Sequence, residues 1–159
     1  MNKVLPCLWF DKEAEAAANY YVSLLPESKI VHVQKSPIDY PGGKKDWVLV
    51  VYFEVAGQSF MALNGGTTFE YNNCVSFMID CKDQAEVDRL WSQILKDGGQ
   101  EVECGWIRDK FNVPWQIIPS DLSRMMADPD KAKATRVMAA MMTMAKIDVA
   151  ALRKAYAGD

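Results

Sequence analysis

The amino-acid sequence predicts an α+β fold, built from paired βαβββ modules with a helical C-terminal extension. The modules are residues 1–66 and 73–119, and the C-terminal helices occupy residues 120–159 of one structural domain. One observation is that the same order of elements, a strand, a helix and three strands, occurs twice. Another is sequence similarity, because residues 10–15 align with 81–86 and residues 53–63 with 108–118. A repeated unit too small to be stable alone must pack against its copy, so we expect the two sheets to enclose a cleft.

The first module is predicted from changes in hydrophobic period. Residues 4–10 are short, apolar and aromatic, which indicates a strand. Apolar residues then recur at helical spacing up to Leu25, with Asp11 as the expected N-cap and Pro26 ending the helix. Residues 29–35, 47–55 and 59–63 have strand character, and the Asn64-Gly65-Gly66 turn closes the module.

The second module and the tail follow the same reasoning. Strands are expected at residues 74–81, 100–104, 106–110 and 115–118, with a helix over 83–96 that ends at Gly98-Gly99. Helices are expected at 121–126, 130–145 and 148–156, with Asp130 and Asp148 as N-caps. Six of the nine methionines lie between Met125 and Met144. They indicate either packing of an amphipathic helix or a flexible surface for a partner or a second subunit.

Composition excludes several classes of function. Half of the 159 residues are hydrophobic, and the formal net charge is −3, which gives no electrostatic basis for binding nucleic acid or an anionic membrane. The sequence has neither a signal-peptide pattern nor an apolar run long enough to cross a bilayer, so a cytoplasmic protein is expected. Its four cysteines form no CxxC pair and accompany one histidine, which disfavours a zinc site and indicates reduced, mostly buried thiols.

Several motifs carry a resemblance to a known family. They are Leu-Trp-Phe-Asp at 8–11, Phe-Met-Ala-Leu-Asn-Gly-Gly at 60–66, Cys-Gly-Trp at 104–106 and Trp-Gln-Ile-Ile-Pro at 115–119. In this order the chain resembles the PhnB-like, 3-demethylubiquinone-9 3-methyltransferase-like family of the vicinal-oxygen-chelate (glyoxalase/bleomycin resistance/dioxygenase) superfamily. The resemblance covers nearly the whole chain. The sequence has no glycine-rich strand–turn–helix of the Rossmann type, so methyl transfer is not the expected activity.

The resemblance implies where a divalent metal would be held. Superfamily enzymes bind it with side chains from the first and last strand of each module, and these positions fall on Leu5 (or Val4), Met61, Cys74 and Gln116. Of these, Gln116 alone offers an oxygen for a hard divalent ion. We therefore expect no cofactor. The alternatives are a metal-dependent vicinal-oxygen-chelate enzyme in an unexpected geometry, with Glu54 or Asp109 contributing, and a regulatory or interaction protein that uses the methionine-rich C-terminal helix.

The leading hypothesis is a small-molecule binding protein or enzyme of unassigned catalytic residues, and on resemblance alone a homodimer. The candidate pocket comprises Leu5, Met61, Leu63, Asn64, Cys74, Ser76 and Gln116. Strand alternation places Gln116 and Trp115 on opposite faces, with Trp115 packed against a helix. The glycines of the Asn64-Gly65-Gly66 turn indicate either a plain strand ending or a contact to an anion or amide.

Overall fold

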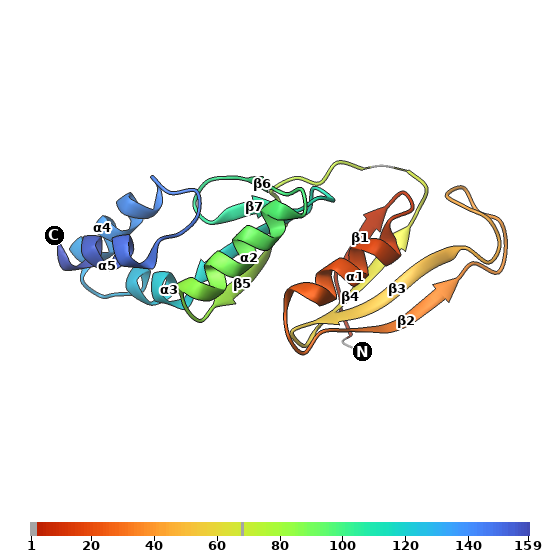
Figure 1. Ribbon diagram of the computed structural model, residues 1–159, viewed down its shortest axis with the longest axis horizontal. Coiled ribbons are helices and arrows are strands. Elements are labelled where there is room, and N and C mark those ends of the chain that lie inside the picture. The colour runs from red at the N-terminus through yellow and green to blue at the C-terminus, as the bar shows by residue number, and fades with distance from the viewer. Residues whose placement is uncertain (1–2, 68) are drawn as a thin grey trace. The chain divides into compact units, whose positions relative to one another are not determined.

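The computed structural model describes residues 3–67 and 69–159 and divides into two compact units, Met1–Glu70 and Tyr71–Asp159. Each unit contains one four-stranded sheet and the helix predicted for its module (Figure 1). The first contains β1 (Cys7–Phe10), α1 (Ala14–Leu24), β2 (Lys29–Lys35), β3 (Val48–Val55) and β4 (Gln58–Asn64). The second contains β5 (Phe77–Cys81), α2 (Gln84–Lys96), β6 (Gln100–Glu101), β7 (Trp106–Arg108) and β8 (Pro114–Pro119). The α+β fold with a repeated βαβββ order is thus confirmed.

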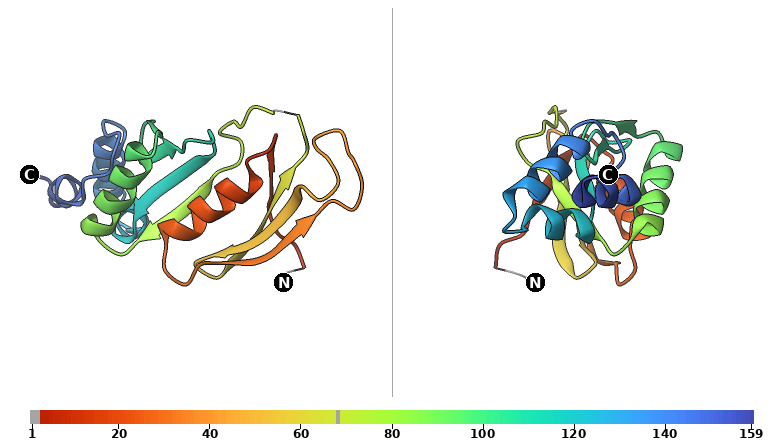
Figure 2. Two further views of the ribbon diagram at one scale, coloured as in Figure 1. Left: turned by 45° about the vertical axis from the view of Figure 1, so that its right-hand side comes forward. Right: turned by 90° about the vertical axis from the view of Figure 1, so that its left-hand side faces the viewer.

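The first sheet has the strand order β1-β4-β3-β2, in which β1 and β4 run parallel and the other pairs antiparallel. Helix α1 lies across one face of this sheet (Figures 1 and 2). Its buried Tyr21 stacks on Phe53 of β3 with ring centroids 5.9 Å apart, and Phe53 stacks on Phe60 of β4. Because side chains alternate along a strand, the neighbours of Phe53 and Phe60 point to the opposite face. No described helix of this unit lies on that face, here called the open face.

The prediction that Asp11 caps α1 is wrong. The helix begins at Ala14, and the preceding Glu13 makes no side-chain cap bond. The Ala14 N–H instead donates to Asn64 Oδ1 at 2.8 Å, so a residue at the end of β4 supplies the cap. In α2 the cap is local, because the Asp83 side chain accepts from the Glu86 N–H at 2.9 Å.

The second sheet has the order β5-β8-β7-β6. Val87, Leu90 and Ile94 of α2 are fully buried, as are Ile107 and Ile117 on the strands. The strand predicted from residue 74 begins only at Phe77, and the strand predicted over 100–104 ends at Glu101. The chain turns at Gly105, whose φ of 82° and contacts with the side chains of Ile118 and Ile147 require glycine.

The C-terminal extension forms α3 (Ser120–Met126), α4 (Lys131–Met141) and α5 (Val149–Ala157), gathered at one end of the second sheet in Figure 2. Asp130 and Asp148 cap α4 and α5 as predicted. The extension packs on Ile118, which points away from its fully buried neighbour Ile117 and so lies on the sheet face opposite α2. The cluster comprises Ile118, Leu122, Met125, Val137, Ile147 and Leu152, with Met141 and Met144 packed against it. Half of the six C-terminal methionines therefore serve packing.

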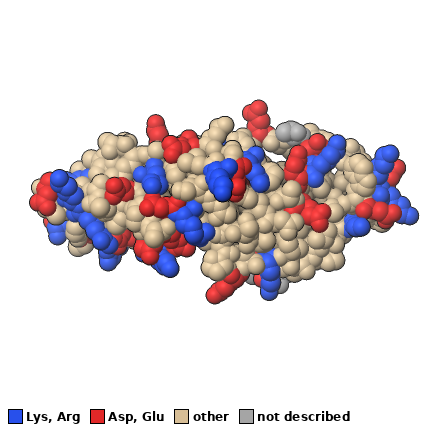
Figure 3. Space-filling view, viewed as in Figure 1, with Lys and Arg blue, Asp and Glu red and all other residues tan. Residues whose placement is uncertain are grey.

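On the face shown in Figure 3, acidic and basic side chains are interspersed, and neither sign forms a continuous field. Among the described residues no helix is long and apolar enough to cross a membrane.

Candidate functional site

The open face of the first sheet brings together three of the candidate residues. Strand register pairs Met61 with Cys7 and Leu63 with Trp9, and the Met61 N–H donates to the Pro6 carbonyl just before β1. Leu5, two residues before Cys7, continues the same face. Local sequence dictates this grouping, because β1 and β4 are parallel neighbours whose alternate residues must share a face.

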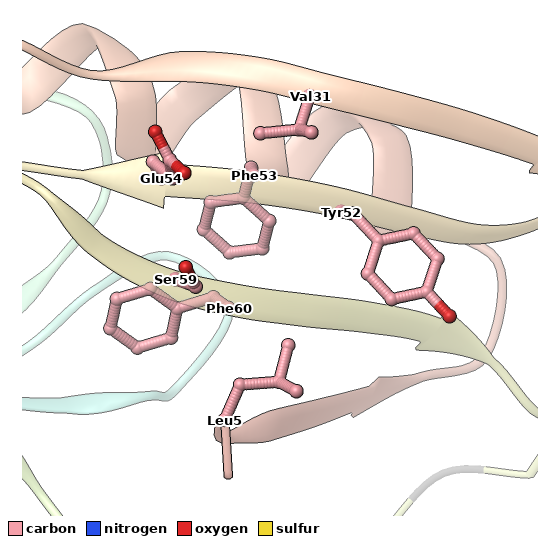
Figure 4. A pocket seen from close by; sticks show the side chains of 7 residues that line it. All are labelled: Leu5, Val31, Tyr52, Phe53, Glu54, Ser59 and Phe60. Atoms are coloured by element: carbon pink, nitrogen blue, oxygen red, sulfur yellow. The ribbon is translucent and has the colours of Figure 1, made fainter. Parts of the chain in front are cut away.

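A small cavity of about 50 Å³ lies at the Leu5 end of this face. It is lined by Leu5, Val31, Tyr52, Phe53, Glu54, Ser59 and Phe60 (Figure 4). The Phe53 and Phe60 rings are buried on the helix-covered side of the sheet, whereas Val31 is half exposed. Such a volume accommodates one small apolar group rather than a whole metabolite, so we call this feature the Leu5 cavity and interpret it as a subsite.

The polar side chains that line this cavity are those of Tyr52, Glu54 and Ser59. The Glu54 carboxylate lies 3.2 Å from Lys29 Nζ, and the Glu54 side chain is 29% exposed. His32, the sole histidine, is exposed on the edge strand β2 and stacks on Tyr52 with centroids 6.4 Å apart. Burial raises the pKa of the Cys7 thiol, which favours its neutral form. The site is thus mainly apolar, with one paired carboxylate.

Asn64 does not face the same way as Met61 and Leu63. Its side chain is 5% exposed on the helix-covered side, where Oδ1 accepts from Ala14 N–H and Nδ2 donates to the Val48 carbonyl at 2.9 Å. Both polar atoms of the amide are therefore engaged in holding α1, β3 and β4 together.

In the second unit the structure brings Ser76 and Gln116 together. Gln116 Nε2 donates to Ser76 Oγ at 2.8 Å, and strand register pairs Gln116 with Met78 and Trp106. Trp115 is 3% exposed on the other face, as alternation predicted. The Ile118 end of the Gln116 face is covered by the C-terminal helices.

Cys74 lies elsewhere than the sequence predicted. It is exposed in a turn that precedes β5, and its N–H is bonded by the Asn72 side chain. Because Phe10 corresponds to Cys81 in the repeat, the counterpart of Leu5 is Ser76, and the counterpart of Cys74 is Lys3. The expectation that Cys74 begins the first strand of the second module is wrong, because β5 begins at Phe77. Ser76, just before β5, is the residue that corresponds to Leu5.

The comparisons with known proteins agree with the repeat architecture. The sequence profile of the 3-demethylubiquinone-9 3-methyltransferase family matches residues 2–118, which span both βαβββ units. The chain belongs to this family. No curated protein matches the chain in sequence.

Solved structures show the same fold as this family member. A PhnB protein from Bacillus cereus is 27% identical over 75% of this chain and 100% of its own, with a TM-score of 0.67. A Pseudomonas aeruginosa protein is 19% identical over 75% and 98%, with a TM-score of 0.60. A glyoxylase/bleomycin resistance protein/dioxygenase domain from a Frankia species is 16% identical over 72% and 94%, with a TM-score of 0.46. The chain has the fold of the Bacillus cereus PhnB protein, with its two βαβββ units.

The residues of this family member do not fit the divalent metal of the wider superfamily. Strand register pairs Met61 with Cys7 rather than with Leu5, and Gln116 with Met78 rather than with Cys74. The paired positions on the first and last strand of each unit are therefore held by Cys7, Met61, Met78 and Gln116. Thioether and thiol groups are poor ligands for hard divalent ions, so of these four residues only Gln116, through its amide oxygen, offers a suitable ligand atom. Across residues 3–67 and 69–159, no three His, Cys, Asp or Glu side chains gather into a possible metal site.

Two residues considered for chemistry have structural environments instead. Asp109 is 3% exposed and accepts from the Phe111 and Val113 N–H groups and from Trp115 Nε1 at 2.9 Å. Cys104 occupies a turn in which its N–H donates to the Met144 carbonyl. Sequence reasoning missed Tyr52 and Ser59 as lining residues. The predicted turn at 56–58 could have indicated both. It pairs Ser59 with Glu54, and Tyr52, two residues before Glu54, lies on the same face of the sheet.

Proposed function

We propose that this family member is a small-molecule binding protein that works without a divalent metal and holds its ligand on the open face of the first sheet. The observation that carries the proposal is the Leu5 cavity, which adjoins the surface formed by Tyr52, Met61 and Leu63. An apolar group of the ligand would enter the cavity, and the rest would lie over Tyr52 and Met61. Apolar lining with few polar groups is typical of small-molecule sites.

The polar groups at this site would orient a ligand rather than bind a metal. Glu54 and Ser59 are cross-strand partners that border the cavity, so they offer a carboxylate and a hydroxyl to a ligand polar group. Transfer of a methyl group would need a binding site for a methyl donor. Neither mixed four-stranded sheet has the parallel, doubly wound arrangement with a glycine-rich turn that Rossmann enzymes use. The proposal therefore does not follow the family's name.

A thermal-shift screen against a panel of small, partly apolar metabolites tests this proposal. Ser59→Leu fills the cavity, and we expect it to weaken each hit at least about tenfold, because the apolar group loses its subsite. Gln58→Leu is the matched control, since it adds the same side chain at the exposed neighbouring position. Hits that bind Ser59→Leu and wild type equally would refute the proposed site.

Chelation separates this proposal from the metal-dependent alternative. We expect the hits to keep their affinity after dialysis against EDTA, and loss of binding that is restored by Mn²⁺ or Zn²⁺ would refute metal-free binding.

We further propose a cytoplasmic homodimer, to be checked by light scattering of the full chain. A monomer at all tested concentrations would contradict the dimer.

A further inference from the structure

The loop between β2 and β3 forms a second hollow, at the other end of the first sheet from the Leu5 cavity. Two adjoining spaces of about 290 and 310 Å³ share Lys12, Tyr40 and Trp47 in their walls. None of the residues that line them also lines the Leu5 cavity. These volumes lie near the lower limit of the roughly 300–1,000 Å³ common among ligand pockets, which suits a ligand with a single ring.

The wall of this hollow is built by two loops in close contact. A Cβ on Gly66 would lie 1.8 Å from Gly42 Cα, and a Cβ on Gly42 would lie 2.4 Å from Gly66 N, so both positions require glycine. The loop is closed by paired backbone bonds between Tyr40 and Gly43 at 2.9 and 3.0 Å. A further bond, from the Ser36 N–H to the Trp47 carbonyl at 2.9 Å, fixes its base. The hollow is therefore formed before any ligand binds.

The side chains around the hollow combine aromatic surface with both signs of charge. Trp47 is 48% exposed and Tyr40 is half-buried. Lys12 and Lys44 supply two cations, and the anionic residues are Asp11 and Glu15. Throughout the described part of the chain, neither lysine lies within 4 Å of a carboxylate. In Figure 3 the end that corresponds to the β2–β3 loop carries side chains of both colours.

We propose that this hollow binds a zwitterion with an aromatic body, of the chemical class of an aromatic α-amino acid. The ring would lie against Tyr40 and Trp47, since aromatic faces favour planar partners. The ligand carboxylate would approach Lys12 and Lys44, and its ammonium group would approach the two acidic side chains. A ligand with one charge would satisfy only half of this lining, because complementary charges on both sides set specificity. Gly66 contributes to this site as part of its wall, through its close contact with Gly42.

The test uses L-phenylalanine as probe, titrated into the full chain and followed by the backbone amide NMR signals of Gly42, Gly43 and Gly66. We expect saturable shifts with a Kd on the order of 1 mM, a reasonable affinity for so small a ligand. Phenylacetate and phenethylamine, which keep one charge each, should bind at least about fivefold more weakly. Equal binding of either analogue, or no saturable shift up to ~20 mM phenylalanine, would overturn the proposal.

Charge variants identify the residues involved. Lys12→Gln combined with Lys44→Gln should weaken phenylalanine binding about fivefold, while phenethylamine binding stays unchanged. The matched control is Lys45→Gln, which removes the neighbouring lysine that does not line the hollow. A loss in the control as large as in the double variant would refute the site. Ser59→Leu should leave these shifts unchanged, so failure of the proposed ligand site and failure of this one are distinguishable.

Discussion

Replacement of Asn64 by alanine should destabilise the first unit more than loss of an ordinary helix cap. The cap itself contributes about 1 kcal/mol. Because the Ala14 N–H that loses this cap is buried, leaving it unsatisfied raises the cost to about 1–3 kcal/mol. The same change also removes the shorter side-chain bond to the Val48 carbonyl, which keeps the bond from the Tyr40 hydroxyl at 3.4 Å. We therefore expect Asn64→Ala to lower the free energy of unfolding by about 2–4 kcal/mol, measured by urea denaturation.

Asp83→Ala is the matched control, because Asp83 caps α2 through one local bond to the Glu86 N–H. It should cost about 1 kcal/mol. Asn64→Asp should fall between the two, since a carboxylate still accepts from Ala14 but cannot donate to Val48. Hydrogen exchange should show faster exchange at the start of α1 in Asn64→Ala. Equal losses of stability in Asn64→Ala and Asp83→Ala would refute the assignment of Asn64 as a bridge.

Three other changes give separable outcomes. Gly65→Ala should destabilise the chain by about 1–3 kcal/mol and alter tryptophan fluorescence, because the new Cβ would lie 1.8 Å from Trp9 Cζ2. Gly57→Ala is the control, because Gly57 has a φ of 81° but no described atom near the position of a Cβ. It should cost about 1 kcal/mol and leave the fluorescence unchanged. Burial, with Glu86 and Asp80 nearby, raises the pKa of the Cys81 thiol from 9.0 to about 12. Alkylation at pH 8 should therefore modify the exposed Cys74 before Cys81. The stability that the neutral Cys81 thiol contributes should be complete below pH 9 and be lost as the pH rises toward 12. Equal alkylation rates would contradict this. Gln84→Ala should speed hydrogen exchange in α5, because Gln84 bonds the Ile147 carbonyl and the Val149 N–H, whereas Lys146→Ala, which removes one exposed ion pair, should not.

The sequence predicted the fold well because strand alternation and the helical repeat of apolar residues both depend on neighbouring residues. Alternation alone placed Gln116 and Trp115 on opposite faces, and the N-caps at Asp130 and Asp148 needed only neighbouring residues. The repeat also contained the correct second-unit position, since the offset between Phe10 and Cys81 relates Leu5 to Ser76. The prediction of Cys74 came from extending a strand beyond the residues that pair with β8.

The remaining features depend on contacts between distant residues. The cap supplied by Asn64 joins residues 50 positions apart, and nothing near Ala14 indicates it. The approach of Gly42 to Gly66 likewise depends on how the β2–β3 loop closes. The sequence identified Gly66 as a turn residue, but its contact with Gly42 could not be read from that turn.

The packing of the C-terminal helices on Ile118 makes the two repeats unequal. In the first unit the corresponding residue is Leu63, which lies on the open face, and the 36–47 loop has no counterpart in the second unit, where residues 102–105 join β6 to β7. Internal duplication would ordinarily imply two equivalent sites per chain. Here the C-terminal helices pack on the second sheet at the position that is uncovered in the first. Under the proposed function only the first repeat would bind a ligand, so the stoichiometry at the open face should be one ligand per chain.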